Sequence, residues 1–289
     1  MDFQTRQKNI KRSYIICSTG RSGSTLLSKT LVKLEQFGNP DEYFHHMNIE
    51  ELQLKKKPER FIPYFESVLD KGLSANGTFA IKMHWWQLND FLETTRQLDV
   101  FEGMTDIEIL NSAFPNLKFI YIWRQDMVAQ AVSTEVALQT GVWMQGVNSS
   151  VSSYAFKVNS AEVPNIAPNM KNIEQESAKL AQTSVKFRPL RIYKWEQKFK
   201  DQNRRWQQFF AKHQLEYHEL TYERLTHNFE QEMTDVIRFL ELETEVDLSL
   251  LKMPTKRQAN AVNEQFATYY KALPAIFLKG INKLNLLFS

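Results

Sequence analysis

The stretch that decides the fold lies near the amino end and joins an apolar segment to an amphipathic one. It reads Ser18-Thr19-Gly20-Arg21-Ser22-Gly23-Ser24-Thr25-Leu26-Leu27. Residues 14–18 form a short apolar run typical of a buried strand, while Leu27, Leu31 and Leu34 recur at helical spacing. A strand that passes through a turn of small residues into a helix is the opening of a phosphate-binding βα unit.

The turn combines several groups that bind anions. The first backbone N–H groups of a helix have no internal acceptor and lie at the positive end of the helix dipole. Glycines allow the sharp turn, hydroxyls add donors, and an arginine adds a charge with a planar set of donors. We therefore predict an anion-binding loop made of Gly20, Arg21, Ser22, Gly23, Ser24 and Thr25.

This loop departs from the one that binds nucleoside triphosphates. The latter requires Gly-x-x-x-x-Gly-Lys-Ser/Thr, and no lysine follows Gly23. Without that lysine, and without an obvious acidic partner for Mg²⁺, ATP chemistry is disfavoured. A loop that binds phosphate without a metal suits a phosphosulfate, because its transferred group carries less charge than a γ-phosphate.

Further strands are predicted at residues 79–83, 118–123 and 216–220, and helical patterns alternate with them. The alternation predicts an α/β fold with a central parallel sheet flanked by helices. We expect a single domain over residues 1–289, with a substrate-side loop at about 143–172 and an apolar tail at about 273–289.

Local signals predict where several helices begin and end. Thr105 with Glu108 matches a capping box, and Asp126 is placed to cap a helix that ends before Gly141. Gly38 suits the stop of the first helix, and Asn228 is predicted to cap a late helix, with Gln231 as its partner. A long helix is expected around an aromatic stripe that runs from Trp195 to Phe210.

Composition limits the class of protein. The 36 basic and 33 acidic residues give a net charge of +3, too small to indicate a nucleic-acid binder. Cys17 is the only cysteine, and no uncharged apolar run reaches about 18 residues, so we expect a cytoplasmic protein without a spanning helix. The apolar tail packs on the domain, forms a homodimer or lies on a membrane surface. No His, Cys, Asp or Glu group has metal-site spacing, so no metal is predicted.

At the turn, the sequence resembles the sulfotransferases that use 3′-phosphoadenosine 5′-phosphosulfate (PAPS), in which a basic residue precedes Ser-Gly-Ser/Thr-Thr. Residues 37–44, Phe-Gly-Asn-Pro-Asp-Glu-Tyr-Phe, are similar to the Gly-x-Pro-x-Glu-Tyr-Phe segment of the bacterial trehalose 2-sulfotransferase family. The resemblance continues weakly to about residue 272. It implies PAPS as cosubstrate, no metal, and a hydroxyl acceptor on a carbohydrate or related small metabolite.

The resemblance also implies roles for individual residues. Residues 20–25 match the loop that holds the 5′-phosphosulfate, and Arg124 with Ser133 matches the pair that binds the 3′-phosphate. Their interval is nine residues, where the wider superfamily usually has eight, so Arg124 is the firmer match. Glu42 matches the carboxylate proposed as general base, and we expect partial burial to raise its pKa.

Two later segments join the predicted donor site through the same resemblance. Tyr222 begins Tyr-Glu-Arg-Leu, which is similar to a Tyr-Glu-Asp-Leu turn before the last core helix, although arginine stands where an acid is common. Lys256 and Arg257 belong to a segment that resembles the late basic segment of the family, which implies that they close over the nucleotide.

Lys82 and His84 end the second predicted strand beside Trp85 and Trp86. A cation and aromatic rings at a strand's carboxyl end suit a sugar site, although core packing explains the tryptophans almost as well. We predict that Lys82 or His84 helps Arg21 to stabilise charge on the leaving oxygen. His45 and His46 are candidates for substrate contact or ordinary surface residues.

Two other functions stay open at this point. A kinase-like phosphotransferase on the same scaffold would need Mg²⁺, and the missing Gly-Lys-Ser/Thr counts against it. A catalytically silent nucleotide-binding module would keep the phosphate contacts but lack a placed base, and Glu42 counts against that.

Overall fold

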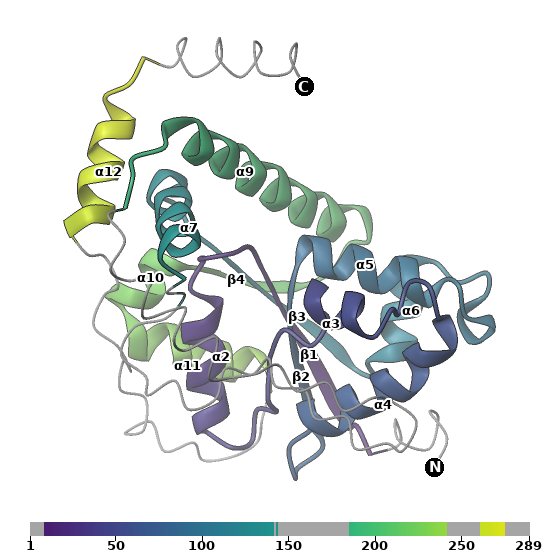
Figure 1. The fold of residues 1–289 in the computed structure, drawn as a ribbon. Coiled ribbons are helices and arrows are strands. Elements are labelled where there is room, and N and C mark those ends of the chain that lie inside the picture. The colour runs from purple at the N-terminus through teal and green to yellow at the C-terminus, as the bar shows by residue number, and fades with distance from the viewer. Residues whose placement is uncertain (1–8, 142, 144–184, 242–260, 275–289) are drawn as a thin grey trace, which may run out of the picture. The chain divides into compact units, whose positions relative to one another are not determined.

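The computed structural model describes residues 9–141, 143, 185–241 and 261–274 (Figure 1). The chain divides into two compact units, one of Met1–Gln125 with Gln202–Pro254 and one of Asp126–Asp201 with Thr255–Ser289. The single-domain organisation expected from the sequence stays a prediction. The predicted loop at 143–172 and the tail at 273–289 lie almost wholly outside the described residues.

A parallel sheet forms the centre of the first unit. Its strands in the described residues stand in the order β2-β1-β3-β4 (Figure 1). Their bounds are β1 Arg12–Ser18, β2 Thr78–His84, β3 Leu117–Trp123 and β4 Tyr217–Thr221. Each overlaps a strand predicted from the sequence, and the predicted α/β fold with a parallel sheet is confirmed.

One face of the sheet is covered by α2 (Ser24–Lys33) and α11 (Phe229–Phe239). Alternate residues of β1 and β3 point to this face because successive side chains of a strand point to opposite sides. A single buried apolar cluster joins the strands and both helices, and it includes Tyr14, Ile16, Ile120, Ile122, Leu27, Leu31, Met233 and Val236.

The opposite face packs against α4 (Phe61–Gly72), α5 (Trp85–Thr95) and α6 (Asp106–Ala113), with aromatic side chains from α4, from α5 and from Phe114, which follows α6 (Figure 1). The rings of Phe79 and Phe114 stack with centroids 5.4 Å apart. Residues 202–212 of α9 (Pro189–Lys212) also cover this face, where Phe210 meets Tyr121 at 5.6 Å. Trp206, fully buried in the same segment, donates from its indole nitrogen to the Ser18 carbonyl at 3.0 Å, which fixes the end of β1.

Local helix signals are mostly confirmed. The capping box predicted for α6 is present, with the Thr105 N–H donating to Glu108 Oε2 at 2.8 Å. In the second unit, α7 spans Met127–Thr140, the Asp126 side chain accepts from the Ala129 N–H at 2.9 Å, and Gly141 ends the helix with a φ of 69°. The long aromatic helix is α9.

One predicted cap is wrong, and another has the predicted position without the side-chain hydrogen bond. Gly38 does not end α2, because the helix stops at Lys33 and Glu35 takes the left-handed position with a φ of 58°. Asn228 precedes α11 as predicted, but its backbone at φ −120°, ψ 49° is not extended and its side chain makes no cap hydrogen bond. Gln231 instead donates to Asp235 at 3.1 Å.

Several elements were not predicted. Besides α4 and α5, they include the helices α3 (His46–Glu51), α10 (Tyr222–His227) and α12 (Ala261–Lys271) and the 3₁₀ turns η1 (Pro58–Arg60) and η2 (Asp99–Phe101). The Tyr222 segment, expected as a turn, is therefore a short helix. None of the helices within the described ranges is long and apolar enough to cross a membrane.

The second unit has its own apolar core. α7, residues 189–201 of α9, and α12 contribute buried residues that include Val132, Ile192 and Phe266. Beside this core, the carboxylate of Glu135 is 1% exposed and accepts from Arg191 Nε at 2.9 Å. The ion pair satisfies a charge that would otherwise be costly to bury.

Gly38 offers a test of the packing around β2. A Cβ added there would lie 2.8 Å from the Gly72 carbonyl oxygen and 2.9 Å from the Ala80 backbone nitrogen. Gly38→Ala should lower the free energy of unfolding by about 3 kcal/mol, since left-handed strain and a backbone clash add. Gly103 is the matched control, with a φ of 73° and nothing within 4 Å of an added Cβ. Gly103→Ala should cost only about 1 kcal/mol; equal losses in urea unfolding would contradict this account.

Candidate active site

The predicted strand–turn–helix is present between β1 and α2. Arg21 and Gly23 both take left-handed conformations, with φ of 61° and 91°. The first intrahelical bond runs from the Leu27 N–H to the Gly23 carbonyl at 3.1 Å, which leaves the N–H groups of the first turn directed out of the helix end. Gly23 is required because a Cβ there would lie 2.7 Å from Cδ2 of Tyr222.

Ser22 supplies a buried hydroxyl inside this loop. Its side chain is 0% exposed, and its Oγ has no hydrogen-bond partner among the residues that the structure describes. A buried hydroxyl without a partner costs free energy relative to one in water. At a helix N-terminus, such a group fits an oxygen of a bound anion.

Two guanidinium groups lie close enough to repel each other. The pKa of Arg21 is lowered by burial first and by the charge of Arg124 second, while Tyr222 opposes the change. The Arg124 guanidinium lies over the Tyr222 ring, 4.7 Å from its centroid, and its Nε is 3.8 Å from Glu223 Oε1. A pair of neighbouring cations favours binding of an anion with more than one negative charge.

A second cluster forms around Glu42. Lys82 Nζ lies 3.0 Å from Glu42 Oε1 and donates to Thr25 Oγ1 at 3.2 Å, so one cation joins the carboxylate to the first turn of α2. His84 Nε2 lies 3.5 Å from Glu42 Oε2, and His84 Nδ1 is 2.9 Å from Ser18 Oγ. Lys82 and His84 are two apart in β2 and therefore share one face of the sheet.

The backbone fixes the segment that carries Glu42 beside β2. The Lys82 N–H donates to the Asp41 carbonyl at 3.0 Å, and the Asp41 side chain accepts from the Glu42 N–H at 2.8 Å. The hydroxyl of Tyr43 also donates to the Asn39 carbonyl at 2.7 Å. Glu42 is thus held by its own segment as well as by its partners.

The pKa of Glu42 is shifted in the direction opposite to the one expected. Burial raises it, but the charges of Lys82 and His84 and the Lys82 hydrogen bond outweigh burial and hold the pKa well below its usual range. The expectation that partial burial would raise the value is wrong because it left the buried lysine out of account. Glu42 is a stable carboxylate here.

The predicted site residues fall into three groups. The loop, Arg124 and Tyr222 lie in the first unit, as does the cluster of Glu42, Lys82 and His84. Ser133 lies in α7, in the second unit, so its pairing with Arg124 stays a prediction. Lys256 and Arg257 lie outside the described residues.

The neighbouring aromatic residues divide between core and site. Trp85 packs on Trp206 with centroids 5.2 Å apart, so it belongs to the core. Trp86 is half-buried and meets the His45 ring at 5.8 Å, and the charge of His45 also lowers the pKa of Glu42. His46 is the first residue of α3, and the structure does not describe its side chain.

Sequence reasoning missed Gln87, whose Nε2 donates to Glu42 Oε2 at 3.1 Å. Its amide oxygen accepts from the His84 N–H at 2.6 Å, which makes it the third-position partner of a capping box at the start of α5. The spacing His84-x-x-Gln87 was the available signal. Histidine is not among the preferred N-cap residues, so the pattern was not recognised.

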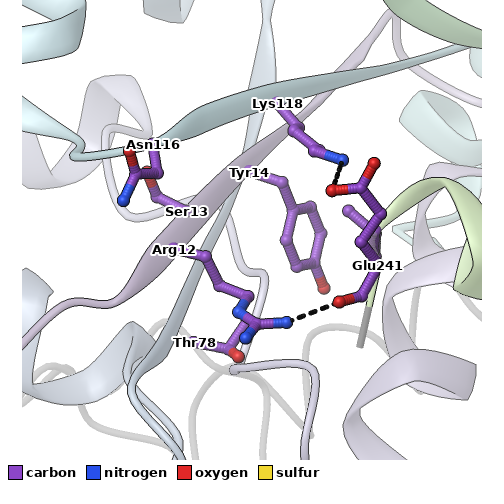
Figure 2. Close-up of a pocket in the computed structure, with 8 residues that line it drawn as sticks. Arg12, Ser13, Tyr14, Thr78, Asn116, Lys118 and Glu241 are labelled. Carbon is purple, nitrogen blue, oxygen red and sulfur yellow. Dashed lines mark hydrogen bonds and ion pairs between the residues drawn. The ribbon is translucent and has the colours of Figure 1, made fainter. Parts of the chain in front are cut away.

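A hollow at the other end of the sheet is a poorer candidate (Figure 2). Arg12, Ser13 and Thr78 line it, and these are the first residues of β1 and β2. Its cations are already paired, since Arg12 donates to the Glu241 carbonyl at 2.8 Å and Lys118 Nζ lies 2.9 Å from Glu241 Oε2 (Figure 2). Ligands of open α/β sheets bind at the carboxyl ends of strands.

No cluster of three or more His, Cys, Asp or Glu side chains suited to a metal occurs within the described ranges. The prediction of a metal-free site stays a prediction. The buried hydroxyl of Ser22, the paired guanidinium groups and the helix N-terminus fit the phosphate and sulfate oxygens of PAPS.

The Glu42–Lys82 pair should control stability in a pH-dependent way. Glu42→Gln leaves Lys82, 5% exposed, without its counter-charge, and should lower the free energy of unfolding at pH 7 by about 3 kcal/mol. Because the folded pKa of Glu42 is depressed, its contribution is complete above the unfolded value of about 4.3 and is lost as pH falls further. In urea unfolding, the difference in the free energy of unfolding between the wild type and Glu42→Gln should therefore become smaller below about pH 4. The exposed Glu50→Gln is the control; no loss with Glu42→Gln at pH 7 would mean that the pair contributes nothing.

Comparison with known proteins agrees with the motifs. The family model described as Stf0 sulphotransferase matches residues 13–153 and 147–273. A trehalose 2-sulfotransferase from Mycobacterium tuberculosis is 29% identical over 157 residues, which cover 46% of this chain and 59% of that protein. The chain thus spans less than two thirds of the length of the curated relative that it matches. Because the family model covers nearly all of residues 13–273, the chain belongs to the Stf0 sulphotransferase family.

Proposed function

We propose that this protein transfers a sulfuryl group from PAPS to a hydroxyl of a carbohydrate or related small metabolite. The observation that carries the proposal is the double contact of Lys82, 3.2 Å from Thr25 Oγ1 and 3.0 Å from Glu42 Oε1. Through one lysine side chain, this contact links the carboxylate of the proposed base to the anion-binding loop. Membership of the family supports the reaction, and the matched trehalose 2-sulfotransferase supports a sugar acceptor.

In the proposed complex, the loop holds the 5′-phosphosulfate of PAPS. The N–H groups of the first turn of α2, the Ser22 hydroxyl and Arg21 donate to its oxygens. Arg124 binds the 3′-phosphate beside Tyr222, with Ser133 as its predicted partner. Lys256 and Arg257 are proposed to close over the nucleotide.

The proposed reaction is an in-line displacement at sulfur. The acceptor oxygen forms a bond to sulfur while the bond from sulfur to the bridging oxygen breaks. Adenosine 3′,5′-bisphosphate leaves with the electron pair, and Glu42 takes the proton of the acceptor hydroxyl. Arg21, Lys82 and His84 stabilise the charge that develops on the bridging oxygen.

The low pKa of Glu42 requires that the base be activated. A carboxylate held by a buried lysine is a weak proton acceptor, so the Lys82 contact has to weaken before Glu42 can act. Lys82 already contacts Thr25 on the loop. An anion bound there attracts Lys82 away from Glu42, which raises the pKa of the carboxylate once the donor is in place.

The two alternative functions make different demands on the site. A kinase-like phosphotransferase needs a magnesium ion between phosphate oxygens and an acidic side chain, whereas Glu42 is neutralised by Lys82. A silent nucleotide-binding module gains nothing from a buried carboxylate, because Glu42 and Lys82 cost desolvation energy that apolar residues would avoid. The acceptor, the oligomeric state and the cytoplasmic location stay predictions.

Nucleotide selectivity tests the donor site. Adenosine 3′,5′-bisphosphate should raise the melting temperature of the protein more than ATP, which lacks the 3′-phosphate that Arg124 would hold. Arg124→Ala should weaken bisphosphate binding by about 2 kcal/mol, the scale of a charge-assisted hydrogen bond. Arg224→Ala is the control, because Arg224 is half-exposed and pairs with Glu232 at 2.9 Å. Equal stabilisation by both nucleotides, or stabilisation that depends on Mg²⁺, would favour the kinase-like alternative.

Transfer itself is tested with PAPS and a panel that contains trehalose, other glucosides and simple alcohols. Mass spectrometry should detect an acceptor heavier by one sulfuryl group, and Glu42→Gln should lower kcat by about 10²- to 10⁴-fold because an amide cannot take the proton. Bisphosphate should bind at least as tightly as to the wild type, because Glu42 no longer competes for Lys82, and this binding shows that the variant is folded at the assay temperature. Glu50→Gln should retain wild-type kcat. A Glu42→Gln protein with normal turnover would assign the base elsewhere, with His84 and His45 as the next candidates.

A further inference from the structure

Gln87 is a buried amide that contacts the carboxylate of Glu42. Its side chain is 0% exposed and lies at the third position of α5. The amide oxygen accepts from the His84 N–H at 2.6 Å, and the amide nitrogen donates to Glu42 Oε2 at 3.1 Å. Both ends of one planar group are therefore bonded, the first to backbone and the second to the predicted base.

The backbone contact determines which way the amide faces. Only the oxygen of a glutamine side chain can accept from an N–H group, so the His84 N–H fixes the oxygen toward the helix start. The NH₂ group is then directed at Glu42, where it can donate but cannot accept. A capping box at the end of β2 thus delivers a rigid neutral donor to one carboxylate oxygen.

The two oxygens of Glu42 have different partners. Oε1 faces Lys82 at 3.0 Å, whereas Oε2 receives Gln87 at 3.1 Å and has His84 at 3.5 Å. Lys82 also contacts Thr25, so its charge can shift toward an anion on the loop. Gln87 is tied to backbone and cannot follow that shift, so it still holds Oε2 when the lysine moves.

From this geometry we propose that Gln87 is a positioning residue, which fixes the plane of the Glu42 carboxylate and keeps Oε1 available for the acceptor proton when Lys82 turns to the bound donor. The inference rests on the proposed function, in which Glu42 is the base. In this account, one buried amide has two roles: it caps the start of α5, and it orients the Glu42 carboxylate.

The charged groups around Glu42 come from three elements. β2 supplies Lys82 and His84, the segment before α3 supplies His45, and all three favour the ionised carboxylate. α2 supplies Lys29, whose own pKa is lowered by burial and by the charge of Lys82, while Asp41 opposes the change. Gln87 is the uncharged member of the set, so replacing it changes the carboxylate environment without removing a cation.

Two substitutions separate positioning from helix capping. Gln87→Glu keeps an oxygen for the His84 N–H but puts a second carboxylate against Glu42, so the pair shares a proton and Glu42 titrates at higher pH. Gln87→Met removes both contacts and should lower kcat about tenfold, the equivalent of one charge-assisted hydrogen bond. The acid limb of the kcat–pH profile should move to higher pH in Gln87→Glu, because Glu42 must be ionised to accept a proton.

The titration of Glu42 gives a readout that does not depend on activity. Protein labelled with carbon-13 at glutamate carboxyl groups should show the Glu42 signal titrating at higher pH in both Gln87 variants, with Glu42→Gln identifying the signal. The matched control is Glu108→Met, which removes the third-position partner of the exposed capping box on α6. It should lower the melting temperature as Gln87→Met does, yet leave the Glu42 titration and the kcat–pH profile unchanged.

The outcomes distinguish this inference from the proposed function. A fall in melting temperature with wild-type Glu42 titration and an unmoved acid limb in both Gln87 variants would reduce Gln87 to a helix cap and overturn the inference. A wild-type protein that transfers no sulfuryl group to any acceptor would overturn the proposed function instead. In that case the carbon-13 titration still decides whether Gln87 controls the Glu42 carboxylate.

Discussion

The site depends on the register of β1 between two parallel neighbours. Ser18, the last residue of β1, pairs with His84 on one side and Ile122 on the other. All three strands therefore end at one edge of the sheet, and the segments after them begin there together. The anion loop comes from β1, Lys82 and His84 from β2, and Arg124 from the end of β3. A slip of one residue in either pairing would turn these side chains to the opposite face.

Charge is distributed unevenly over this edge. Lys82 pairs with the mostly buried carboxylate of Glu42, Arg124 lies 3.8 Å from Glu223, and the charge of Arg124 lowers the pKa of Arg21. Buried charges persist only where partners compensate the loss of solvation. The neighbouring guanidinium groups and the buried Ser22 hydroxyl, which has no hydrogen-bond partner among the described residues, together favour an anionic ligand. The Glu42 carboxylate differs from these groups, because Lys82 already compensates its charge before any ligand binds.

Most features with local signals could be predicted from the sequence, and those that depend on residues far along the chain could not. The strand–turn–helix at residues 18–27 and the caps of α6 and α7 depend on residues within one turn of each other. The pKa of Glu42 depends on Lys82, far along the chain, which a backbone bond between the Glu42 segment and β2 brings to it. Gln87 was missed although its signal is local, because the histidine three residues before it is not among the preferred N-cap residues. The start of α5 was missed because the helix follows β2 directly, with no glycine or proline between them.

Under the proposed function, the features that are unfavourable in the free protein indicate an order of events. An anion on the loop would relieve the repulsion between Arg21 and Arg124, and it would also give a partner to the Ser22 hydroxyl, which has none in the part of the chain that the structure describes. The Glu42–Lys82 pair, in contrast, is favourable until that anion competes for the lysine. Donor binding therefore releases free energy at one cluster and can weaken the ion pair at the other, so that binding of the phosphosulfate on the loop activates the base. The base is then held in an inert ion pair until a donor with a transferable sulfuryl group has bound. The buried lysine thus links recognition of the donor to the chemical step.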